Sequence, residues 1–301
     1  MGDHFPSPSS LVVYVNGKYV PEAEALISVY DHGVLYGDGV FDTICAWNGF
    51  LFRLDEHIER LFRSMHAVRL GAPVTKSELR EIVLEAVRRN GLKSAYVKIV
   101  ATRGVSVEPL LDPRGCKSGL IVFVRPFLWL IKPERLDSGI RTKIVSVRRI
   151  PPACLDPKVK SLNYQNQAMA KIEAIEAGVD EAIMLDVNGS VSEGPTYNLC
   201  LISNGVLYTP AENILLGITR ETIFELCRRE GLNAIERSVT SYDLYNANEL
   251  FFCSTAGGIM PIVEVDGRQI GDGRPGAVTK RLTKLYFDML ERGEHGTRIY
   301  E

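Results

Sequence analysis

The 301-residue sequence lacks the features that mark several large classes of protein. It has no run of about 18 apolar residues, the length that a membrane-spanning helix needs, and its first residues lack the basic start and apolar stretch of a secretory signal. Its 35 basic and 37 acidic residues are spread along the chain, without the basic block that binds a nucleic-acid backbone. These absences favour a cytoplasmic protein that binds neither membranes nor nucleic acids.

Two signatures of cofactor sites are also missing. The six cysteines stand singly, with no Cys-x-x-Cys pair and no histidine at ligand spacing, so we expect no metal site and interpret the cysteines as reduced packing residues. Spacing alone leaves a disulfide open. The stretch Tyr36-Gly-Asp-Gly39 lacks the third glycine and the following helix of a dinucleotide-binding turn, which argues against a dinucleotide-dependent oxidoreductase.

The composition predicts two globular domains. Hydrophobic residues make up 46% of the chain and charged residues 24%, as in an ordinary globular protein. The chain of 301 residues is longer than the roughly 250 residues at which a single hydrophobic core usually stops growing. The proline-bounded stretch Arg125-Pro-Phe-Leu-Trp-Leu-Ile-Lys-Pro133 fits neither a clean helix nor a long strand. We therefore expect a small α+β domain over residues 1–124, a linker over 125–136 and a larger domain over 137–301.

The chain alternates strand and helix patterns, which predicts an α/β (α+β) fold. In the first half we expect a hairpin around the Asn16-Gly17 turn, helices over Asp55–Leu70 and Thr75–Asn90, and strands over Ala95–Thr102 and Gly119–Val124. In the second half the expected strands are Arg141–Val147, Glu181–Leu185, Tyr197–Ser203, Val206–Tyr208 and Leu250–Ser254. The expected helices there are Tyr164–Ala177, Arg220–Glu230 and Ala277–Arg292.

One lysine and one acid are candidates for chemistry. Lys160 lies between a proline-punctuated segment and a predicted helix, where a partly neutral amine could condense with an aldehyde such as pyridoxal phosphate. Glu193 follows a predicted hairpin, where its carboxylate could keep the nitrogen of a pyridine ring protonated. The alternatives are a solvated surface lysine and an exposed turn residue.

Two segments could bind a phosphate group. Leu216-Gly-Ile-Thr219-Arg passes from a loop into a helix whose first N–H groups have no intrahelical partner, so Thr219 could be both cap and ligand. The small residues Ser254-Thr255-Ala256-Gly257-Gly258 permit close backbone approach to an anion. Simple helix capping and an ordinary strand-end turn are the alternatives.

Together with Asp31-His-Gly-Val-Leu-Tyr-Gly-Asp-Gly-Val-Phe41-Asp and His57-Ile-Glu-Arg60-Leu, these segments resemble the class IV aminotransferases. That family includes branched-chain aminotransferases, D-amino-acid aminotransferases and aminodeoxychorismate lyases. The resemblance spans roughly residues 11 to 290 and is specific, because separated motifs occur in the family's order.

The resemblance implies a two-domain fold type IV enzyme with pyridoxal 5'-phosphate between its domains, usually as a homodimer or higher homo-oligomer. It implies that Lys160 carries the cofactor as a Schiff base and moves the substrate's α-proton, and that Glu193 pairs with the pyridine nitrogen. It further implies that Tyr164 bonds the phenolic oxygen. The phosphate would be held by Arg60, through a forked contact, and by Ile218, Thr219 and Thr255.

The substrates implied are an amino donor and a 2-oxo acid acceptor such as 2-oxoglutarate. Asn163-Tyr164 is most similar to the branched-chain members, which favours apolar side chains. Tyr36, Phe41, Tyr96, Lys98, Thr255 and Ala256 are the candidate substrate-binding residues. For the aromatic pair Tyr36 and Phe41, core packing is the alternative.

Residue 98 departs from the branched-chain pattern. These enzymes commonly have Tyr-x-Arg where this chain has Tyr96-x-Lys98, and lysine offers a point charge instead of a bidentate fork. Lys98, the following Thr-Arg-Gly and the stretch Ala256-Gly-Gly-Ile-Met260-Pro are similar to the lyases and to some (R)-selective amine transaminases. Branched-chain amino acids remain the first choice, with those activities and the D-amino-acid one as alternatives. A non-catalytic member of the fold would be expected to have lost Lys160 or Glu193.

Overall fold

The computed structural model describes residues 11–106, 108, 110–129, 132 and 134–301, which form two compact units. The first unit comprises Met1–Leu128, Val159–Asn163 and Leu290–Glu301, and the second comprises Trp129–Lys158 and Tyr164–Met289. Parts of the predicted linker at 125–136 lie outside the described residues, so the predicted boundary stays a prediction. The short segment Val159–Asn163, which carries Lys160, packs with the first unit.

The first unit is built on one antiparallel sheet of seven strands. In sheet order these are β15 (Gly296–Arg298), β4 (Phe50–Phe52), β3 (Gly39–Trp47), β5 (Ala95–Val105), β6 (Lys117–Pro126), β1 (Val12–Val15) and β2 (Lys18–Pro21). The Asn16-Gly17 hairpin is confirmed, and both residues have the positive φ that a tight hairpin turn requires. Strand β6 extends through Pro126, into the segment that was expected to be irregular.

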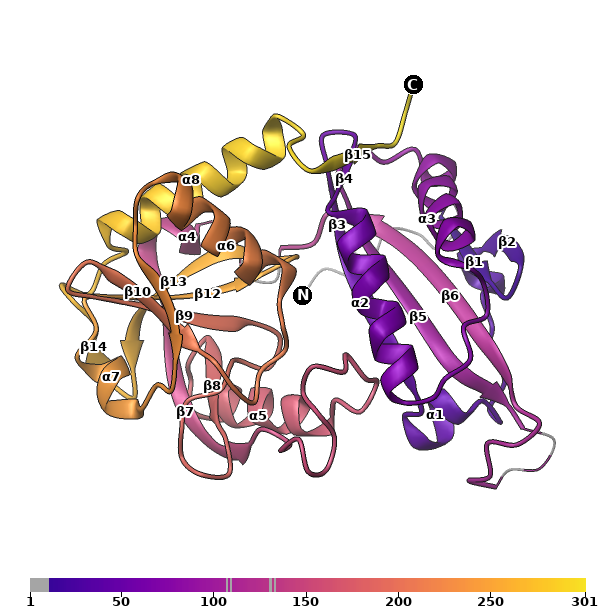
Figure 1. The fold of residues 1–301 in the computed structure, drawn as a ribbon, viewed down its shortest axis with the longest axis horizontal. Helices are drawn as coiled ribbons and strands as arrows, with labels where there is room; N and C mark the ends of the chain where they lie inside the picture. The colour runs from indigo at the N-terminus through magenta and orange to yellow at the C-terminus, as the bar shows by residue number, and fades with distance from the viewer. Residues whose placement is uncertain (1–10, 107, 109, 130–131, 133) are drawn as a thin grey trace. The chain divides into compact units, whose positions relative to one another are not determined.

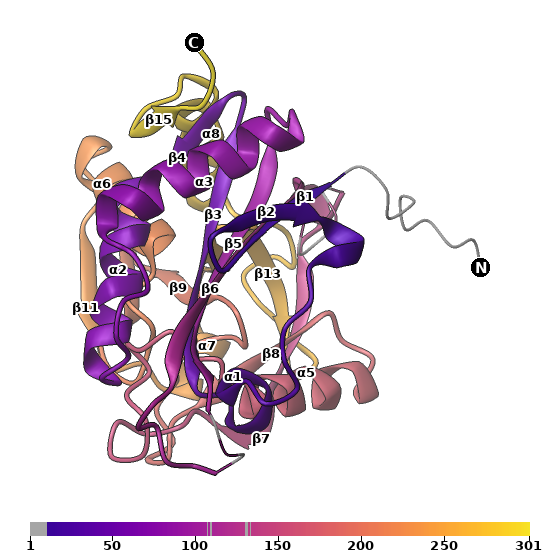
Figure 2. The ribbon, with the colours of Figure 1, turned by 90° about the vertical axis from the view of Figure 1, so that its right-hand side faces the viewer.

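Two amphipathic helices cover one face of this sheet, α2 (Leu54–Ala67) and α3 (Lys76–Asn90), as Figure 1 and Figure 2 show. Both helices were predicted. Thr75 accepts a hydrogen bond from the backbone of Glu78, whose side chain bonds back to the backbone of Thr75, so the predicted capping box is confirmed. Two short helices, η1 (Glu22–Glu24) and α1 (His32–Tyr36), precede β3.

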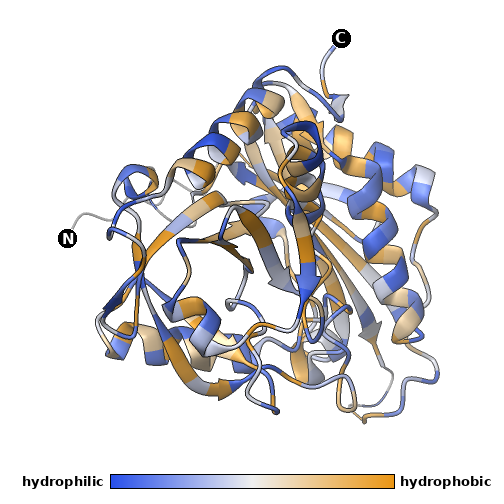
Figure 3. Cartoon of the chain, turned by 60° about the vertical axis from the view of Figure 1, so that its left-hand side comes forward, coloured by the Kyte–Doolittle hydropathy of each residue, from blue (hydrophilic) through white to orange (hydrophobic). Residues whose placement is uncertain are grey.

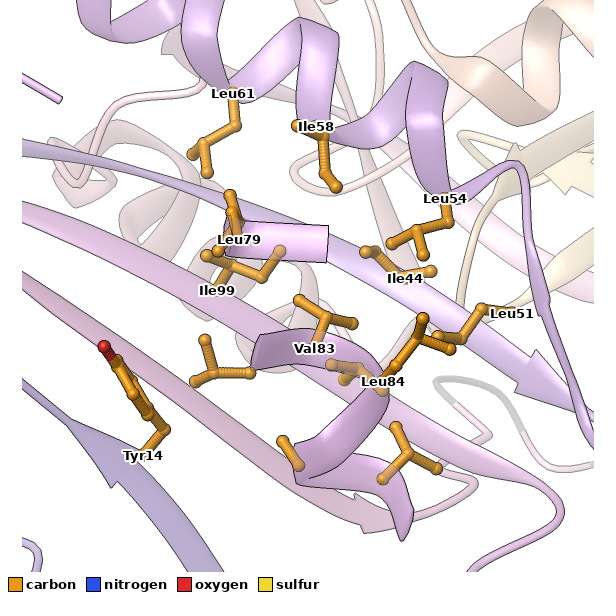
Figure 4. Close-up of a cluster of buried hydrophobic side chains, with 14 of the residues drawn as sticks. Tyr14, Ile44, Leu51, Leu54, Ile58, Leu61, Leu79, Val83, Leu84 and Ile99 are labelled. Carbon is orange, nitrogen blue, oxygen red and sulfur yellow. The ribbon is translucent and has the colours of Figure 1, made fainter. Parts of the chain in front are cut away.

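The core of the first unit lies between the two helices and the sheet. Figure 4 shows side chains of α2 and α3 pointing toward those of the strands, among them Leu61 of α2, Val83 of α3 and Ile44 of β3. All three are fully buried, and a buried aliphatic side chain of this size contributes roughly 1.5–3 kcal/mol. This packing fixes α2 against β3, and it therefore also fixes the candidate site residues that the two elements carry.

A glycine permits an irregular stretch of the β5–β6 pair. The pairing register shifts between Thr102 and Val105, and Gly104 within this stretch has φ +90°. A Cβ atom at this position would lie 1.7 Å from the carbonyl oxygen of Lys117. No L-residue with a side chain could take this place without moving the neighbouring strand.

The second unit contains a mixed sheet. Its path runs β11 (Ala234–Arg237), β10 (Val206–Pro210), β9 (Asn198–Ser203), β12 (Glu249–Ser254), β13 (Gly258–Val265), β7 (Ile140–Arg148) and β8 (Glu181–Leu185), with β14 (Arg268–Gln269) paired to β13. The helices are α4 (Arg135–Ser138), α5 (Gln165–Glu176), α6 (Ile218–Arg229), α7 (Ser241–Tyr245) and α8 (Ala277–Glu291). Figure 3 shows hydrophobic residues on the strands and alternating colours along the helices, as amphipathic helices require.

All six cysteines lie in the described part of the chain and are free thiols. Four of them, Cys45, Cys200, Cys227 and Cys253, are buried, as packing residues should be, whereas Cys154 is exposed and the packing interpretation is wrong for it. No helix among the described residues has the length and apolar character needed to cross a membrane.

Candidate active site

Lys160 lies on a short extended segment beside the first residues of β3, on the side of the strand where β4 pairs only with its last residues. Its carbonyl oxygen accepts a hydrogen bond of 2.9 Å from the backbone of Phe41, and Leu162 donates to the carbonyl of Gly39. On its other side, the Lys160 N–H donates to Oγ of Ser64 in α2, at 3.2 Å. Because both backbone groups of Lys160 are fixed, the segment sets the direction in which the side chain leaves. The side chain of Lys160 is half-buried, which disfavours the alternative of a fully solvated surface lysine.

The amines of Lys160 and Lys98 both lie close to the ring of Phe41. The Nζ atom of Lys160 lies 4.6 Å from the centroid of the Phe41 ring, and Nζ of Lys98 lies 4.4 Å from the same centroid. Burial, and next the positive charge of Lys160, lower the pKa of Lys98. Among the described residues no carboxylate pairs with Lys98. Two amines in one apolar setting favour the binding of an anion.

Phe41, Tyr96 and Lys98 share one face of the sheet. Phe41 pairs with Val100 and Thr43 with Lys98, and side chains two residues apart on a strand point the same way. Tyr36 lies outside the sheet, on α1, where its ring meets that of His32 edge to face at 5.0 Å. The structure thus groups three of the first-unit substrate candidates and places Tyr36 separately.

Arg60 belongs to a buried charged cluster on the helix-covered side of β3. Its Nε and Nη2 atoms donate to the two carboxylate oxygens of Asp42 at 2.8 and 2.7 Å, and Nδ1 of His57 lies 2.6 Å from the same carboxylate. Asp42 and His57 are fully buried and Arg60 is 6% exposed. The Nε–Nη2 edge of the guanidinium is therefore occupied by Asp42, so the forked contact expected with phosphate cannot use that edge.

The cluster's protonation follows from its geometry. Burial alone would raise the pKa of Asp42, but the charges and hydrogen bonds of Arg60 and His57 hold it well below its usual range. Burial lowers the pKa of His57 against the opposing pull of Asp42. The Nε2 atom of His57 is buried and has no hydrogen-bond partner among the described residues. Asp42 is thus a carboxylate held by the permanent cation of Arg60 and by the imidazole of His57.

Glu193 is a buried acid, 5% exposed, which overturns its alternative as an exposed turn residue. It follows β8 and the Asn188-Gly189 turn, and its backbone oxygen accepts from the N–H of Met184. Its Oε1 atom accepts from Nε of Arg149 at 2.7 Å. Its Oε2 atom accepts from Nδ2 of Asn198 at 3.1 Å and from the backbone of Leu215 at 3.0 Å.

The N-terminus of α6 offers backbone donors, although the capping prediction for Thr219 is wrong. The N-cap residue is Gly217, no side chain caps the helix, and Ile218 and Thr219 are the first two helical residues. The first intrahelical bond to a preceding carbonyl is that of Glu221 to Gly217, so the N–H groups before it have no helical acceptor. A glycine suits the cap because a Cβ there would lie 1.9 Å from Oδ1 of Asn198.

A tight turn of small residues joins β12 to β13. Thr255 is half-buried and Ala256 is 4% exposed. The Oγ atom of the preceding Ser254 is buried and has no hydrogen-bond partner in the described part of the chain. A buried hydroxyl without a partner costs free energy, so this hydroxyl is suited to bind a ligand or a water molecule beside the turn.

Tyr164 precedes α5 at the N-cap position and is half-buried. Its carbonyl accepts the first bond of the helix, from Ala168. The sequence interpretation identified none of the residues that hold the candidates in place, namely Asp42, His57, Ser64, Arg149, Asn198 and Leu215. Only one signal pointed to any of them, the spacing of His57 and Arg60, which places both on one face of a helix.

The comparison with known proteins gives a consistent result. Residues 39–265 match the model of the family described as amino-transferase class IV. A Methanocaldococcus jannaschii protein, whose name as a branched-chain-amino-acid aminotransferase is provisional, is 45% identical over 292 residues, covering 96% of this chain and 99% of its own. The branched-chain-amino-acid aminotransferase of Pseudomonas aeruginosa is 38% identical over 285 residues, covering 93% of this chain and 92% of its own.

Solved structures agree with this match. The branched-chain aminotransferase of Thermoproteus uzoniensis, crystallised with norvaline, superimposes with a TM-score of 0.91 at 36% identity, covering 97% of this chain and all of that one. The Escherichia coli branched-chain amino acid aminotransferase gives a TM-score of 0.93 at 31% identity with the same coverage. Another enzyme of that name, at a TM-score of 0.90 and 33% identity, was solved with pyridoxamine 5'-phosphate. The chain therefore belongs to the class IV aminotransferase family and has the fold type IV architecture of pyridoxal-phosphate enzymes.

Proposed function

We propose that this protein transfers amino groups between a branched-chain or related apolar amino acid and a 2-oxo acid such as 2-oxoglutarate, with Lys160 as the residue that carries pyridoxal 5'-phosphate. The observation that carries the proposal is the placement of Lys160. Its backbone is pinned between β3 and α2 while its amine lies over Phe41, beside a second amine. An amine in such a setting is suited to condense with an aldehyde.

The residues present fit the cofactor. Its phosphate needs several donors, which the N–H groups of Ile218 and Thr219 at the start of α6 can supply. Arg60 and Thr255 are the further phosphate residues that we propose. The unpartnered Oγ of Ser254 fits an anion at the turn beside it. The ring nitrogen needs an acid that stays ionised, and Glu193 is buried with a charged donor on it. Tyr164 is proposed to donate to the phenolic oxygen.

When bound, pyridoxal phosphate supplies an electron-accepting ring that stabilises negative charge at the substrate's α-carbon. Lys160 holds the cofactor at rest, and its Nζ atom takes the α-proton from the substrate and delivers it again. Glu193 would keep the ring nitrogen of the bound cofactor protonated by accepting its hydrogen bond. Phe41 and Tyr96 are proposed to offer apolar surface to the substrate's side chain, together with Tyr36 and Ala256, which favours substrates with apolar side chains.

Lys98 is proposed to attract the distal carboxylate of glutamate. It is half-buried on the same sheet face as Phe41, and no carboxylate of the described chain neutralises it. A substrate carboxylate would supply the missing partner. Leucine has no distal carboxylate, so it would gain nothing from Lys98.

Absorbance titration of the purified protein with L-leucine, L-glutamate and (R)-1-phenylethylamine tests the assignment. We expect both L-amino acids to bleach the visible cofactor band. Replacing Lys98 by methionine should raise the glutamate concentration for half-bleaching about 10- to 100-fold, because a charge-assisted hydrogen bond is worth about 1.5–3 kcal/mol. The leucine response should hardly change, and Lys98→Arg should keep the glutamate response.

Other outcomes would redirect the proposal. Bleaching mainly by the (R)-amine would assign an (R)-selective amine transaminase, to which Lys98 in place of arginine is also suited. Bleaching by D-amino acids alone would assign a D-amino-acid aminotransferase. Release of pyruvate from aminodeoxychorismate would assign an aminodeoxychorismate lyase. A protein that binds no cofactor after addition of pyridoxal phosphate would not be an aminotransferase at all.

We also propose that two copies of the chain associate. The stretch Leu26–Tyr36 exposes a series of large hydrophobic side chains, with exposed fractions from 40% to 78%: Leu26, Ile27, Val29, Tyr30, Val34, Leu35 and Tyr36. A group of exposed apolar side chains so close in sequence is suited to an interaction site. Sedimentation velocity should find a dimer or a higher oligomer, and Val29→Asp should weaken it. A wild-type monomer at micromolar concentration would contradict the proposal.

A further inference from the structure

The carboxylate of Glu193 is held on both oxygens by groups of its own unit. Arg149 donates to one oxygen at 2.7 Å, and Asn198 and the backbone of Leu215 donate to the other at 3.1 and 3.0 Å. The side chains of Arg149 and Glu193 are 8% and 7% exposed. Donors on both oxygens leave the carboxylate little freedom to rotate, so its plane and direction are set by the protein.

The backbone of Arg149 is held in place independently of its contact with Glu193. It follows directly on β7, and its N–H donates to the carbonyl of Leu185, at the end of β8, at 2.9 Å. Within the described part of the chain, Glu193 is the only side chain to which the Arg149 guanidinium bonds. A nearly buried arginine with one acidic partner needs that partner's charge, because a lone buried cation is costly.

Asn198 ties the same carboxylate to the loop before α6. Its Nδ2 atom donates both to Glu193 and to the carbonyl of Leu215, and its Oδ1 atom occupies the space that a side chain at Gly217 would need. Two further hydrogen bonds hold the same loop. The side chain of Asn213 donates to Asp186, and the carbonyl of Asn213 accepts from the hydroxyl of Ser192. Glu193 and the N-terminus of α6 thus belong to one hydrogen-bonded assembly.

We propose that Arg149 is a positioning residue that keeps Glu193 ionised and aimed at its ligand, so that the cofactor's ring nitrogen, and not Glu193, holds the proton between them. This inference rests on the proposed role of Glu193 in cofactor binding. The proton is shared between a carboxylate and a pyridine nitrogen of comparable basicity, so a permanent cation on the carboxylate decides on which atom it stays. Arginine suits the task because it remains charged at every relevant pH.

The predicted consequence concerns the location of that proton. Replacing Arg149 by glutamine keeps a hydrogen-bond donor and removes the charge. The proton should then move to Glu193, leaving a neutral ring nitrogen that withdraws electrons poorly. We expect kcat to fall about 10- to 100-fold, the usual cost of removing a group that orients a ligand of a reactive centre, while KM changes little.

The test uses holoenzyme reconstituted with pyridoxal phosphate labelled with ¹⁵N in the ring. The ¹⁵N chemical shift distinguishes a protonated nitrogen from a neutral one without any turnover. The wild type should show the protonated value and Arg149→Gln the neutral one, whereas Arg149→Lys, which restores a charge, should recover the protonated value at least in part. Arg148→Gln is the matched control, because among the described residues the adjacent Arg148 side chain bonds only to carbonyls of its own strand.

The outcomes separate the two proposals. If the wild type retains no label, the proposed function fails. If the wild type shows a protonated nitrogen and Arg149→Gln keeps both that shift and the kcat of Arg148→Gln, the role of Arg149 is overturned. Should Arg149→Gln not fold, Arg149→Lys provides the second measurement, because it retains the charge but loses the planar guanidinium that contacts Glu193. The ring nitrogen of this variant should lose its proton at a lower pH than that of the wild type, and an unchanged pH would equally overturn the proposal.

Discussion

Replacing Lys160 by alanine is expected to abolish covalent attachment of pyridoxal phosphate and to lower kcat by roughly 10²- to 10⁴-fold or more, the share that a positioned acid–base group supplies. The amine of Lys160 is held over Phe41 by backbone bonds to β3 and α2, and no other lysine of the described chain has this placement. Borohydride reduction followed by mass spectrometry of the peptides should find the cofactor's added mass on Lys160 in the wild type and nowhere in the variant.

A neighbouring lysine provides the control for this experiment. Lys158 lies two residues away, with a side chain that is 60% exposed and 3.6 Å from Asp156. Lys158→Ala should therefore keep the attachment and nearly all activity. If the reduced cofactor were found on Lys98, which faces the same ring, the assignment of the nucleophile would pass to that residue. Cofactor-dependent activity that survives in Lys160→Ala would also contradict the role proposed for Lys160.

The local structure around these residues followed largely from local sequence signals. Asn16-Gly17 predicted a hairpin because both residues tolerate positive φ, and Thr75 with Glu78 predicted a helix start because their side chains satisfy free N–H groups. Lys160 and Glu193 were found through the chemistry of a lysine and an acid in suitable segments. Such signals depend on neighbours within a few residues, and a single sequence contains them.

Strand β3 was missed because both of its faces are buried. Gly39–Trp47 shows no alternation of apolar and polar residues, and the acid at its centre, Asp42, interrupts the hydrophobic run. Only the packed structure shows that Asp42 meets two polar residues of α2. The sequence contains His57 and Arg60 at helical spacing, but nothing in their own segment identifies the acid 15 residues earlier as their partner.

The position of Lys160 beside β3 also could not be predicted from the residues near it in the sequence. The stretch 159–163 lies far beyond the predicted linker in the sequence, yet it pairs with β3, about 120 residues earlier in the chain. Arg149 and Glu193 are separated by 44 residues and meet because β7 and β8 are neighbours. Long-range pairing of this kind depends on sheet order, which one sequence without relatives does not specify.

Replacing Asp42 by asparagine is expected to lower the free energy of unfolding by about 3–5 kcal/mol, the cost of leaving a buried cation without its partner. Asp42 is fully buried and binds Arg60 through both oxygens and His57 through one. Urea unfolding followed by circular dichroism measures the change. Asp55→Asn is the control, because the side chain of Asp55 is 68% exposed and its pairing with Arg80 should contribute little.

The pH dependence of stability provides a second measurement of the same cluster. The pKa of Asp42 is depressed in the folded protein, so its contribution is complete above its unfolded value of about 3.9 and is lost only as the pH falls through the depressed folded value. The pKa of His57 is also lowered by folding, so the unfolded chain binds a proton first. Wild-type stability should therefore begin to decline as the pH falls through about 6.5, the unfolded value of histidine.

The two effects can be told apart in the variant. Without the carboxylate, nothing in the cluster favours a charged imidazole, so the pKa of His57 should fall further in Asp42→Asn and its contribution to the acid decline should persist to lower pH. The variant should start from a lower stability at pH 8 and lose at least as much on acidification to pH 5. Equal stability of Asp42→Asn and the wild type at pH 8 would contradict the interpretation that Asp42 compensates the buried charge of Arg60.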